Sequence, residues 1–167
     1  VQGESGEICV RGPLVMEGYK DLPDESEQAL SSGWLHTGDV GRFDSDGYLY
    51  IVDRTKDMVI TGGFNVFPRE VEDVLSSHAA VAVVAVIGVP DPKWGEAVKG
   101  VVVLRPGFEP SEDLTQELQL LVRNAKGPQQ APKSIDYRTE LPLTPVGKLD
   151  KKAIRAEYWR DSDRAVG

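Results

Sequence analysis

Residues 53–75, DRTKDMVITGGFNVFPREVEDVL, contain the point at which the hydrophobic pattern changes from that of strands to that of a helix. Two short runs, residues 58–61 and 65–67, predict strands on either side of a Gly-Gly pair. Pro68 follows at a position where a first-turn proline favours a helix. One face of this helix carries residues at the i, i+3, i+4, i+7 spacing, namely Val71, Val74, Leu75 and His78. We therefore predict two short strands followed by an amphipathic helix.

Downstream of this helix, strand and helix patterns alternate. Residues 81–89 and 98–104 are rich in β-branched side chains and predict strands, separated by the turn-rich residues 90–95. Ser111 is a candidate N-cap for a helix with an apolar face. That face carries Leu114, Leu118, Leu121 and Val122. With a last strand expected at 135–138 and a last helix at 151–158, the pattern predicts a compact α+β unit of roughly 110 residues.

Upstream of residue 53 the pattern is mostly that of strands. Residues 7–11 alternate polar and apolar side chains, and residues 24–30 predict a short helix. Residues 40–43 and 48–52 flank an Asp-Ser-Asp-Gly turn, which predicts a β-hairpin. We expect this first segment to be β-rich and to lack a core of its own.

Composition excludes several classes of function. The 167 residues carry a net charge of -8 with a pI near 4.8, which argues against the extended basic surface that nucleic acids require. Cys9 is the single cysteine, so an internal disulfide and a cysteine metal cluster are excluded, and a reducing, cytoplasmic location is expected. No apolar run has the length of a membrane span. The chain opens on Val1 without a signal-peptide pattern, and we expect it to be part of a longer protein.

Asp39 and Arg54 are the first candidate binding residues. Asp39 follows a Thr-Gly pair, where close backbone approach and a carboxylate would suit the two hydroxyls of a ribose. The alternative is a turn in which Asp39 caps its own backbone. Arg54 directly follows a predicted strand, where its guanidinium can bind ribose or phosphate oxygens. Its alternative is a surface ion pair with Asp53 or Asp57.

Two glycine-containing turns are the next candidates. Gly62 and Gly63 either form a hairpin turn or leave room for a narrow substrate arm. Gly147-Lys148 is either an exposed turn or a mobile lysine delivered to an anionic transition state. The second turn is not a Walker motif, because the earlier glycine and the following Ser or Thr are missing.

The remaining charged residues favour structural roles. His36 and His78 have no acidic or thiolate neighbours at ligand spacing in the sequence, so we expect no metal site. A basic run near the end is most simply a solvated helix face. It consists of Lys148, Lys151, Lys152 and Arg155.

Taken in order and spacing, these motifs resemble the adenylate-forming superfamily, which includes acyl-CoA synthetases, luciferases and the adenylation domains of peptide synthetases. Residues 6–19 resemble a strand and turn late in the family's large N-terminal domain. Four further segments resemble successive core motifs: residues 34–39, 53–57, 62–72 and 142–148. Among subfamilies, residues 62–68 look closest to fatty-acyl-CoA synthetases.

The resemblance implies a fold and a division of the chain. The implied fold is α+β. Its main part is a small mobile C-terminal domain with a three-stranded sheet, helices that pack against this sheet, and a β-hairpin. The C-terminal domain is preceded by a β-rich segment that ends the large N-terminal domain. Residues 1–53 would be that segment and residues 54–167 the mobile domain, with the hinge at Lys56, whose backbone dihedrals absorb the rotation.

The resemblance also implies roles for the other candidates. Asp39 and Arg54 would hold the ribose hydroxyls of ATP and of the adenylate. Lys148 would be the adenylation lysine, bridging the substrate carboxylate and the α-phosphate. Gly62 and Gly63 would line the tunnel for the pantetheine arm of coenzyme A.

The implied reaction joins a carboxylic acid to ATP and then passes the acyl group to coenzyme A, and the subfamily resemblance implies that the acid is a fatty acid. The required Mg²⁺ would be bound mainly by residues outside this chain, and the partner of the mobile domain would be the enzyme's own N-terminal domain. Two alternatives remain: a carrier-protein-loading adenylation enzyme of the peptide-synthetase type, and a non-catalytic interaction module. We expect the 167 residues alone to be inactive, and carboxylate-dependent ATP–pyrophosphate exchange tests this.

Overall fold

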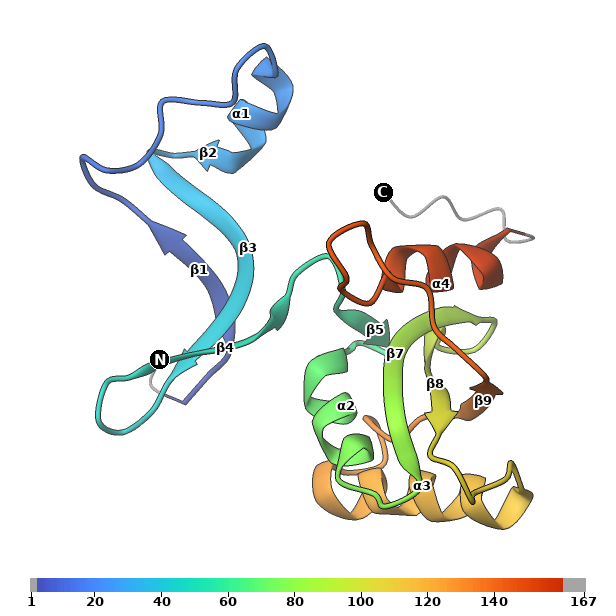
Figure 1. The fold of residues 1–167 in the computed structure, drawn as a ribbon. Helices are drawn as coiled ribbons and strands as arrows, with labels where there is room; N and C mark the ends of the chain where they lie inside the picture. Colours follow the sequence, from blue (N-terminus) through green and yellow to red (C-terminus); the bar gives the residue numbers. More distant parts are fainter. Residues whose placement is uncertain (1–2, 161–167) are drawn as a thin grey trace. The chain divides into compact units, whose positions relative to one another are not determined.

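The computed structural model describes residues 3–160, and they form two compact units that divide between Lys56 and Asp57 (Figure 1). Residues 1–2 and 161–167, at the ends of the expected segments 1–53 and 54–167, lie outside the described residues. None of the described helices combines the length and the apolar character needed to cross a bilayer.

The first unit is a four-stranded antiparallel sheet with one short helix. Its elements are β1 (Gly6–Val10), α1 (Pro23–Ala29), β2 (Leu30–Ser31), β3 (Trp34–Phe43) and β4 (Leu49–Arg54). The long strand β3 is central and pairs with each of the other three strands. The predicted strand, helix and hairpin of this segment are therefore confirmed, and β3 begins earlier than the predicted residue 40.

The turn of the β3–β4 hairpin is organised by one aspartate. The carboxylate of Asp44 accepts hydrogen bonds from the backbone N–H groups of Asp46 and Tyr48, both at 2.9 Å. The backbone bond from Tyr48 is the main reason that the pKa of Asp44 is lowered. Gly47 supplies the positive φ of 84° that the turn requires. The sequence signal of this turn thus acts through an Asx hydrogen bond and a left-handed glycine.

The first unit buries few apolar side chains. Val40 and Val52 are its buried apolar residues, whereas Tyr48 and Ile51 are 68% and 69% exposed. The sheet therefore presents apolar side chains to solvent instead of to a core, which confirms the expectation that this segment lacks a core of its own.

The second unit has a sheet between helices. Its elements are β5 (Val59–Thr61), β6 (Phe64–Val66), α2 (Pro68–Ser76), β7 (Val81–Asp91), β8 (Gly95–Leu104), α3 (Glu112–Lys126), β9 (Ser134–Arg138) and α4 (Lys151–Trp159). Strand β8 pairs antiparallel with β7 and parallel with β9. The β5–β6 hairpin joins this three-stranded sheet where Thr61 pairs with Gly95. The predicted sheet, hairpin and helices are confirmed.

The long β7–β8 hairpin separates two hydrophobic clusters. Val84 and Val86 belong to the cluster under α2 and α3, whereas Ala85 and Ile87 belong to the cluster under α4. Because successive strand side chains point to opposite faces, this alternation places helices on both faces of the sheet (Figure 1). The apolar run is therefore a strand that is buried on both sides from Val84 to Val89, whereas Ala82 and Val83 are exposed.

The hairpin is longer than the sequence predicted. Residues 90–95 were expected to form a long turn, but β7 continues to Asp91 and β8 begins at Gly95. The carboxylate of Asp91 accepts hydrogen bonds from the N–H groups of Lys93 and Trp94, at 2.9 and 2.8 Å. This side-chain bonding closes the turn within three residues.

Helix α4 is attached by ion pairs that the sequence did not reveal. The ammonium of Lys151 lies 2.7 Å from the buried carboxylate of Glu72, and the guanidinium of Arg155 lies 2.6 Å from Glu96. The prediction of a solvated basic face is therefore wrong for these two residues. Their partners lie 79 and 59 positions away, so local spacing carried no sign of them.

A second polar network ties α4 to β8 and β9. Asp136 accepts hydrogen bonds from Lys99 and from the hydroxyl of Tyr158, both at 2.6 Å. Burial would raise the pKa of Asp136, but these two bonds outweigh it and the pKa lies below its ordinary value. Burial and the bond to Asp136 raise the pKa of Tyr158. The network thus favours the ionised carboxylate and the neutral phenol.

Candidate functional site

The segment that carries Asp39 is an irregular part of β3. Glu7 pairs with Val40 while Cys9 pairs with His36, so two steps along β1 correspond to four along β3. Gly38, with a φ of 72°, allows this bulge. The hydroxyl of Thr37 accepts from the N–H of Asp39 at 3.1 Å and donates to the carbonyl of Ile8 at 2.8 Å. The bulge is therefore held by specific bonds.

Asp39 and Arg54 are brought together by the pairing of β3 with β4. They are direct partners in the register, and Arg54 Nε lies 3.0 Å from Asp39 Oδ1. The Arg54 side chain is 69% exposed and the Asp39 side chain 30%. The ion pair of Arg54 is thus formed with Asp39, and Asp53 accepts a hydrogen bond from the backbone N–H of Arg54 at 2.8 Å.

This pair leaves chemistry available for a ligand. The ion pair engages one carboxylate oxygen of Asp39 and the Nε of Arg54. A guanidinium has further N–H donors and a carboxylate has a second oxygen. Together they present an acceptor and several donors side by side, a suitable arrangement for vicinal hydroxyl groups.

Lys56 lies in an exposed turn, residues 55–57, between β4 and β5. The N–H of Thr55 donates to the carbonyl of Gly38 at 2.8 Å, which extends the β3–β4 pairing to the residue before Lys56. The division between the two compact units follows Lys56 directly.

Gly62 and Gly63 form the two-residue turn of the β5–β6 hairpin. Their φ angles of 56° and 84° suit a type I′ turn, which requires positive φ at both positions. A Cβ on Gly62 would lie 2.5 Å from Cε3 of Trp94, whereas a Cβ on Gly63 would meet nothing within 4 Å. The hairpin-turn interpretation is therefore correct as geometry, and Gly62 also makes room for an indole.

Lys148 follows a tight turn just before α4. The N–H of Gly147 donates to the carbonyl of Thr144 at 2.8 Å, and the backbone N–H of Lys148 donates to the Thr144 hydroxyl at 3.1 Å. Leu143 and Leu149 pair across the base of the turn. The backbone is thus well held.

The ammonium of Lys148 differs from those of three other lysines of its unit. The side chain is exposed and makes no ion pair with any of residues 3–160, whereas Lys99, Lys126 and Lys151 each pair with a carboxylate. Two residues later, Asp150 caps α4 by accepting from the N–H of Ala153 at 2.9 Å. A mobile charge is therefore carried on a fixed backbone.

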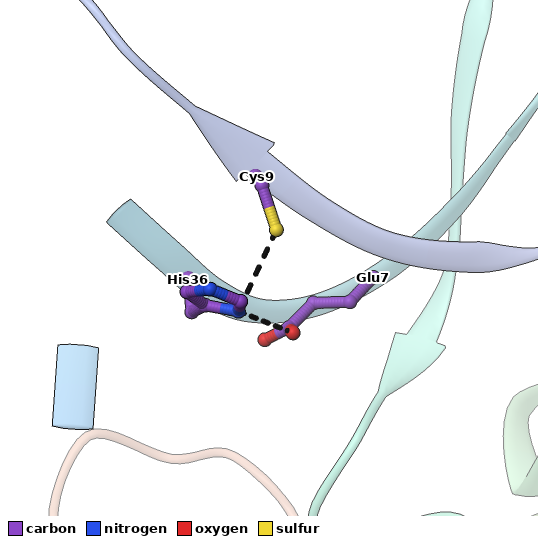
Figure 2. Close-up of side chains that lie close together, drawn as sticks. All are labelled: Glu7, Cys9 and His36. Carbon is purple, nitrogen blue, oxygen red and sulfur yellow. Dashed lines mark hydrogen bonds and ion pairs between the residues drawn. The ribbon is translucent and has the colours of Figure 1, made fainter. Parts of the chain in front are cut away.

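Both histidines have acidic partners, contrary to the expectation from sequence spacing. His36 Nδ1 lies 2.8 Å from Glu7 Oε2 and 3.5 Å from Cys9 Sγ, as Figure 2 shows. His78 Nε2 lies 3.1 Å from Glu117 Oε1. His36 lies in strand β3. These contacts link residues 27 or more positions apart, so only the folded chain shows them.

Sequence reasoning did not single out Glu7 or Trp94. Glu7 Oε1 accepts from the backbone N–H of Gly38 at 3.2 Å and supports the bulge before Asp39. Trp94 packs over Gly62, and its carbonyl accepts from the Gly62 N–H at 3.0 Å. An exposed strand glutamate and an isolated tryptophan carry no local sequence signal of such roles.

Comparison with known proteins gives consistent similarities. Residues 70–148 match the family model described as the AMP-binding enzyme C-terminal domain. The chain is 59% identical to the medium/long-chain-fatty-acid–CoA ligase FadD8 of Mycobacterium tuberculosis, over 99% of this chain and 30% of that protein. It is 46% identical to a long-chain-fatty-acid–CoA ligase of Bacillus subtilis, over 92% of this chain and 27% of that protein.

A solved structure shows the same fold. The amide bond synthetase McbA from Marinactinospora thermotolerans superposes with a TM-score of 0.84 and 43% sequence identity. The match covers 95% of this chain and 32% of that chain. The chain thus spans about 30% of the length of the curated relatives that it matches.

Proposed function

Because the chain belongs to the adenylate-forming enzymes and contains their AMP-binding C-terminal domain, we propose that it is the C-terminal part of an AMP-forming acyl-CoA synthetase. Such an enzyme joins the oxygen of a carboxylate to the α-phosphorus of ATP and releases pyrophosphate. The thiol of coenzyme A then attacks the acyl carbon, and AMP leaves. A cytoplasmic location belongs to the same proposal.

The observation that carries this proposal is the 59% identity, over 99% of the chain, with a fatty-acid–CoA ligase. Fatty acids are therefore the first substrate class to test. The geometry supports the proposal, because each candidate residue except the hinge residue Lys56 lies on backbone that hydrogen bonds or strand pairing define.

Asp39 and Arg54 are proposed to bind the ribose of ATP and of the acyl-adenylate. The bulge at Gly38 and the β3–β4 register hold the carboxylate and the guanidinium 3.0 Å apart before any ligand arrives. Side chains that are already ordered lose less conformational entropy when they bind. The carboxylate would accept hydrogen bonds from the ribose hydroxyls, and the guanidinium would donate to a ribose or phosphate oxygen.

Lys148 is proposed to stabilise the transition state of adenylation. Negative charge accumulates on the carboxylate and α-phosphate oxygens as they join, and an ammonium between them lowers the barrier. Removal of one such electrostatic contact costs roughly a hundred- to a thousandfold in kcat. The exposed, unpaired ammonium on a fixed turn is suited to enter and leave such a site.

Lys56 is proposed as the hinge at which the C-terminal domain turns between the two half-reactions. A few residues outside regular structure suffice to absorb such a rotation. Its position in a turn, at the division between the compact units, supports this role.

Gly63, together with Gly62, is proposed to line the path of the pantetheine arm. At Gly63 an added Cβ would meet no protein atom within 4 Å. If Gly63→Ala lowers thioester formation by more than its loss of stability explains, the cause would therefore be a clash between the added methyl group and the pantetheine arm.

Mg²⁺ would neutralise charge on the ATP phosphates, and we propose that residues outside this chain bind most of it. Mg²⁺ prefers oxygen ligands, and the one cluster of metal-ligand side chains found among residues 3–160 contains an imidazole and a thiol. We therefore assign no step to Mg²⁺ within this chain.

The proposed function is tested in a full-length enzyme that carries this segment, with ATP, a panel of fatty, aryl and amino acids, and three acceptors. The acceptors are coenzyme A, a carrier protein and a simple amine, the last because the similar structure McbA is an amide bond synthetase. Acyl-CoA from a fatty acid is the expected product. Transfer only to a carrier protein or to an amine would replace the proposed acceptor, and no adenylate with any acid would overturn the proposal.

Lys148→Ala tests the lysine separately. We expect adenylation to fall roughly a hundred- to a thousandfold while thioester formation from a supplied acyl-adenylate is retained. Lys152→Ala is the matched control, because Lys152 is also exposed and lies only four residues away. Equal loss of both half-reactions in Lys148→Ala would contradict the assigned role.

A further inference from the structure

We propose that Glu7, Cys9 and His36 form a binding site for Zn²⁺ or a transition-metal ion with the same ligand preferences. The three side chains offer a carboxylate oxygen, a thiolate sulfur and an imidazole nitrogen, and these atoms all lie within 4.8 Å of one another (Figure 2). The site lies wholly in the first unit and does not depend on the proposed enzymatic activity.

The sheet places the three residues on one face. Glu7 and Cys9 are two positions apart on β1, so their side chains project from the same side of the strand. His36 is the direct cross-strand partner of Cys9. A regular register continued from the Glu7–Val40 pair would place Gly38 opposite Cys9. The bulge shifts the pairing by two residues and brings the imidazole there instead.

The two distances from His36 are close to those of a tetrahedral ion, and the third, between Glu7 and Cys9, is at most 4.8 Å. With a Zn–S bond of about 2.3 Å and a Zn–N bond of about 2.0 Å, tetrahedral geometry requires roughly 3.5 Å between sulfur and nitrogen. Cys9 Sγ and His36 Nδ1 lie 3.5 Å apart. Glu7 Oε2 lies 2.8 Å from the same nitrogen and would withdraw by about half an ångström, a small change for a flexible side chain.

Both contacts converge on one ring nitrogen, Nδ1 of His36. A single N–H cannot donate fully to both a carboxylate oxygen and a sulfur atom, whereas an ion between the three atoms would give each of them a partner. Glu7 Oε1 is also fixed by the N–H of Gly38 at 3.2 Å, an interaction of the kind that orients metal-ligating carboxylates.

The set of donors determines the kind of ion. Thiolate and imidazole ligands favour Zn²⁺ and related transition metals over Mg²⁺ and Ca²⁺, which prefer oxygen. Three protein ligands leave a fourth position for water or a small anion. The side chains of His36 and Glu7 are 37% and 33% exposed, so an ion can reach them from solvent.

The proposal is tested by titrating the untagged 167-residue chain with Co²⁺, because a thiolate bound to Co²⁺ gives a charge-transfer band in the near ultraviolet. Zn²⁺ is then added to displace the Co²⁺, which measures the affinity for Zn²⁺. We expect the band in the unaltered chain and its loss in Cys9→Ser. His36→Gln and Glu7→Gln should each weaken Zn²⁺ binding by at least about tenfold, because even the loss of a residue that only hydrogen-bonds to a metal ligand often weakens binding by that factor. His78→Gln removes the other His–Glu pair, which the thiol does not join, and should leave the affinity unchanged.

Two results would overturn the proposal. One is the absence of the band with Co²⁺ in excess while circular dichroism shows the chain to be folded. The other is a band that is unaffected by His36→Gln and Glu7→Gln, which would show that the thiol binds the ion alone. If a variant loses the folded spectrum, His36→Cys provides a second test, because a thiolate there should retain Co²⁺ and strengthen the charge-transfer band.

Discussion

Replacing each glycine of the β5–β6 turn by alanine should give unequal losses of stability. Both glycines have positive φ, so an alanine at either position carries the cost of a left-handed backbone, about 1–2 kcal/mol. Gly63→Ala should show this cost alone, because its Cβ would meet nothing within 4 Å.

Gly62→Ala should cost more, because its Cβ would lie 2.5 Å from Cε3 of Trp94. Overpacking of this kind costs about 1–3 kcal/mol. The lower end applies here because Trp94 is 43% exposed and its indole can shift towards solvent. The free energy of unfolding should therefore fall by about 2–3 kcal/mol in Gly62→Ala and by about 1–2 kcal/mol in Gly63→Ala.

The measurement is urea unfolding followed by far-ultraviolet circular dichroism, repeated in a Trp94→Ala background. In that background the excess cost of Gly62→Ala should disappear, because the clashing ring is gone, while the cost of Gly63→Ala stays the same. Equal losses for the two variants, or an excess at Gly62 that persists without Trp94, would refute the assignment of the clash.

Three further changes test other parts of the structure. Asp39→Asn should raise the KM for ATP in the full-length enzyme, because an amide accepts fewer hydrogen bonds from ribose hydroxyls; an unchanged KM would contradict ribose binding. Glu72→Ala should lower the free energy of unfolding by about 3 kcal/mol, measured with urea, because it leaves Lys151 without its partner in a largely buried position. Because the pKa of Asp136 is lowered in the folded state, its ionised carboxylate stabilises the fold at pH values above its ordinary pKa of 3.8, and this stability is lost as the pH falls through the folded pKa. Asp136→Asn should therefore make the free energy of unfolding less dependent on pH in the acid range.

Local sequence patterns predicted most of the secondary structure. The turn at Asp44, the helix after Pro68 and the helix capped by Ser111 each depend on residues within one or two turns of one another, so their signals are complete in the sequence. The approximate ends of β7 and β8 were less predictable. Asp91 closes their turn through its side chain, whereas the prolines at 90 and 92 and the glycine at 95 favoured a longer turn in the sequence.

The candidate site was predictable residue by residue but not as a set of contacts. The Asp39–Arg54 pair depends on the register of β3 with β4, which shifts between Val40 and Gly41. The Glu7–His36 contact depends on a different irregularity, the bulge between β1 and β3 near Gly38. Register is a property of two strands together, so neither strand's sequence alone could reveal it.

In the Lys148 turn, the backbone structure and the side-chain charge depend on different groups. Hydrogen bonds from backbone groups to Thr144 and pairing at the base define the turn, whereas the lysine side chain contributes no ion pair within residues 3–160. The charge at its tip can therefore be removed or altered by substitution without loosening the scaffold. Under the proposed role of Lys148, rate and folding can be tuned independently at this position, so a change there should be visible in turnover while the melting temperature stays constant.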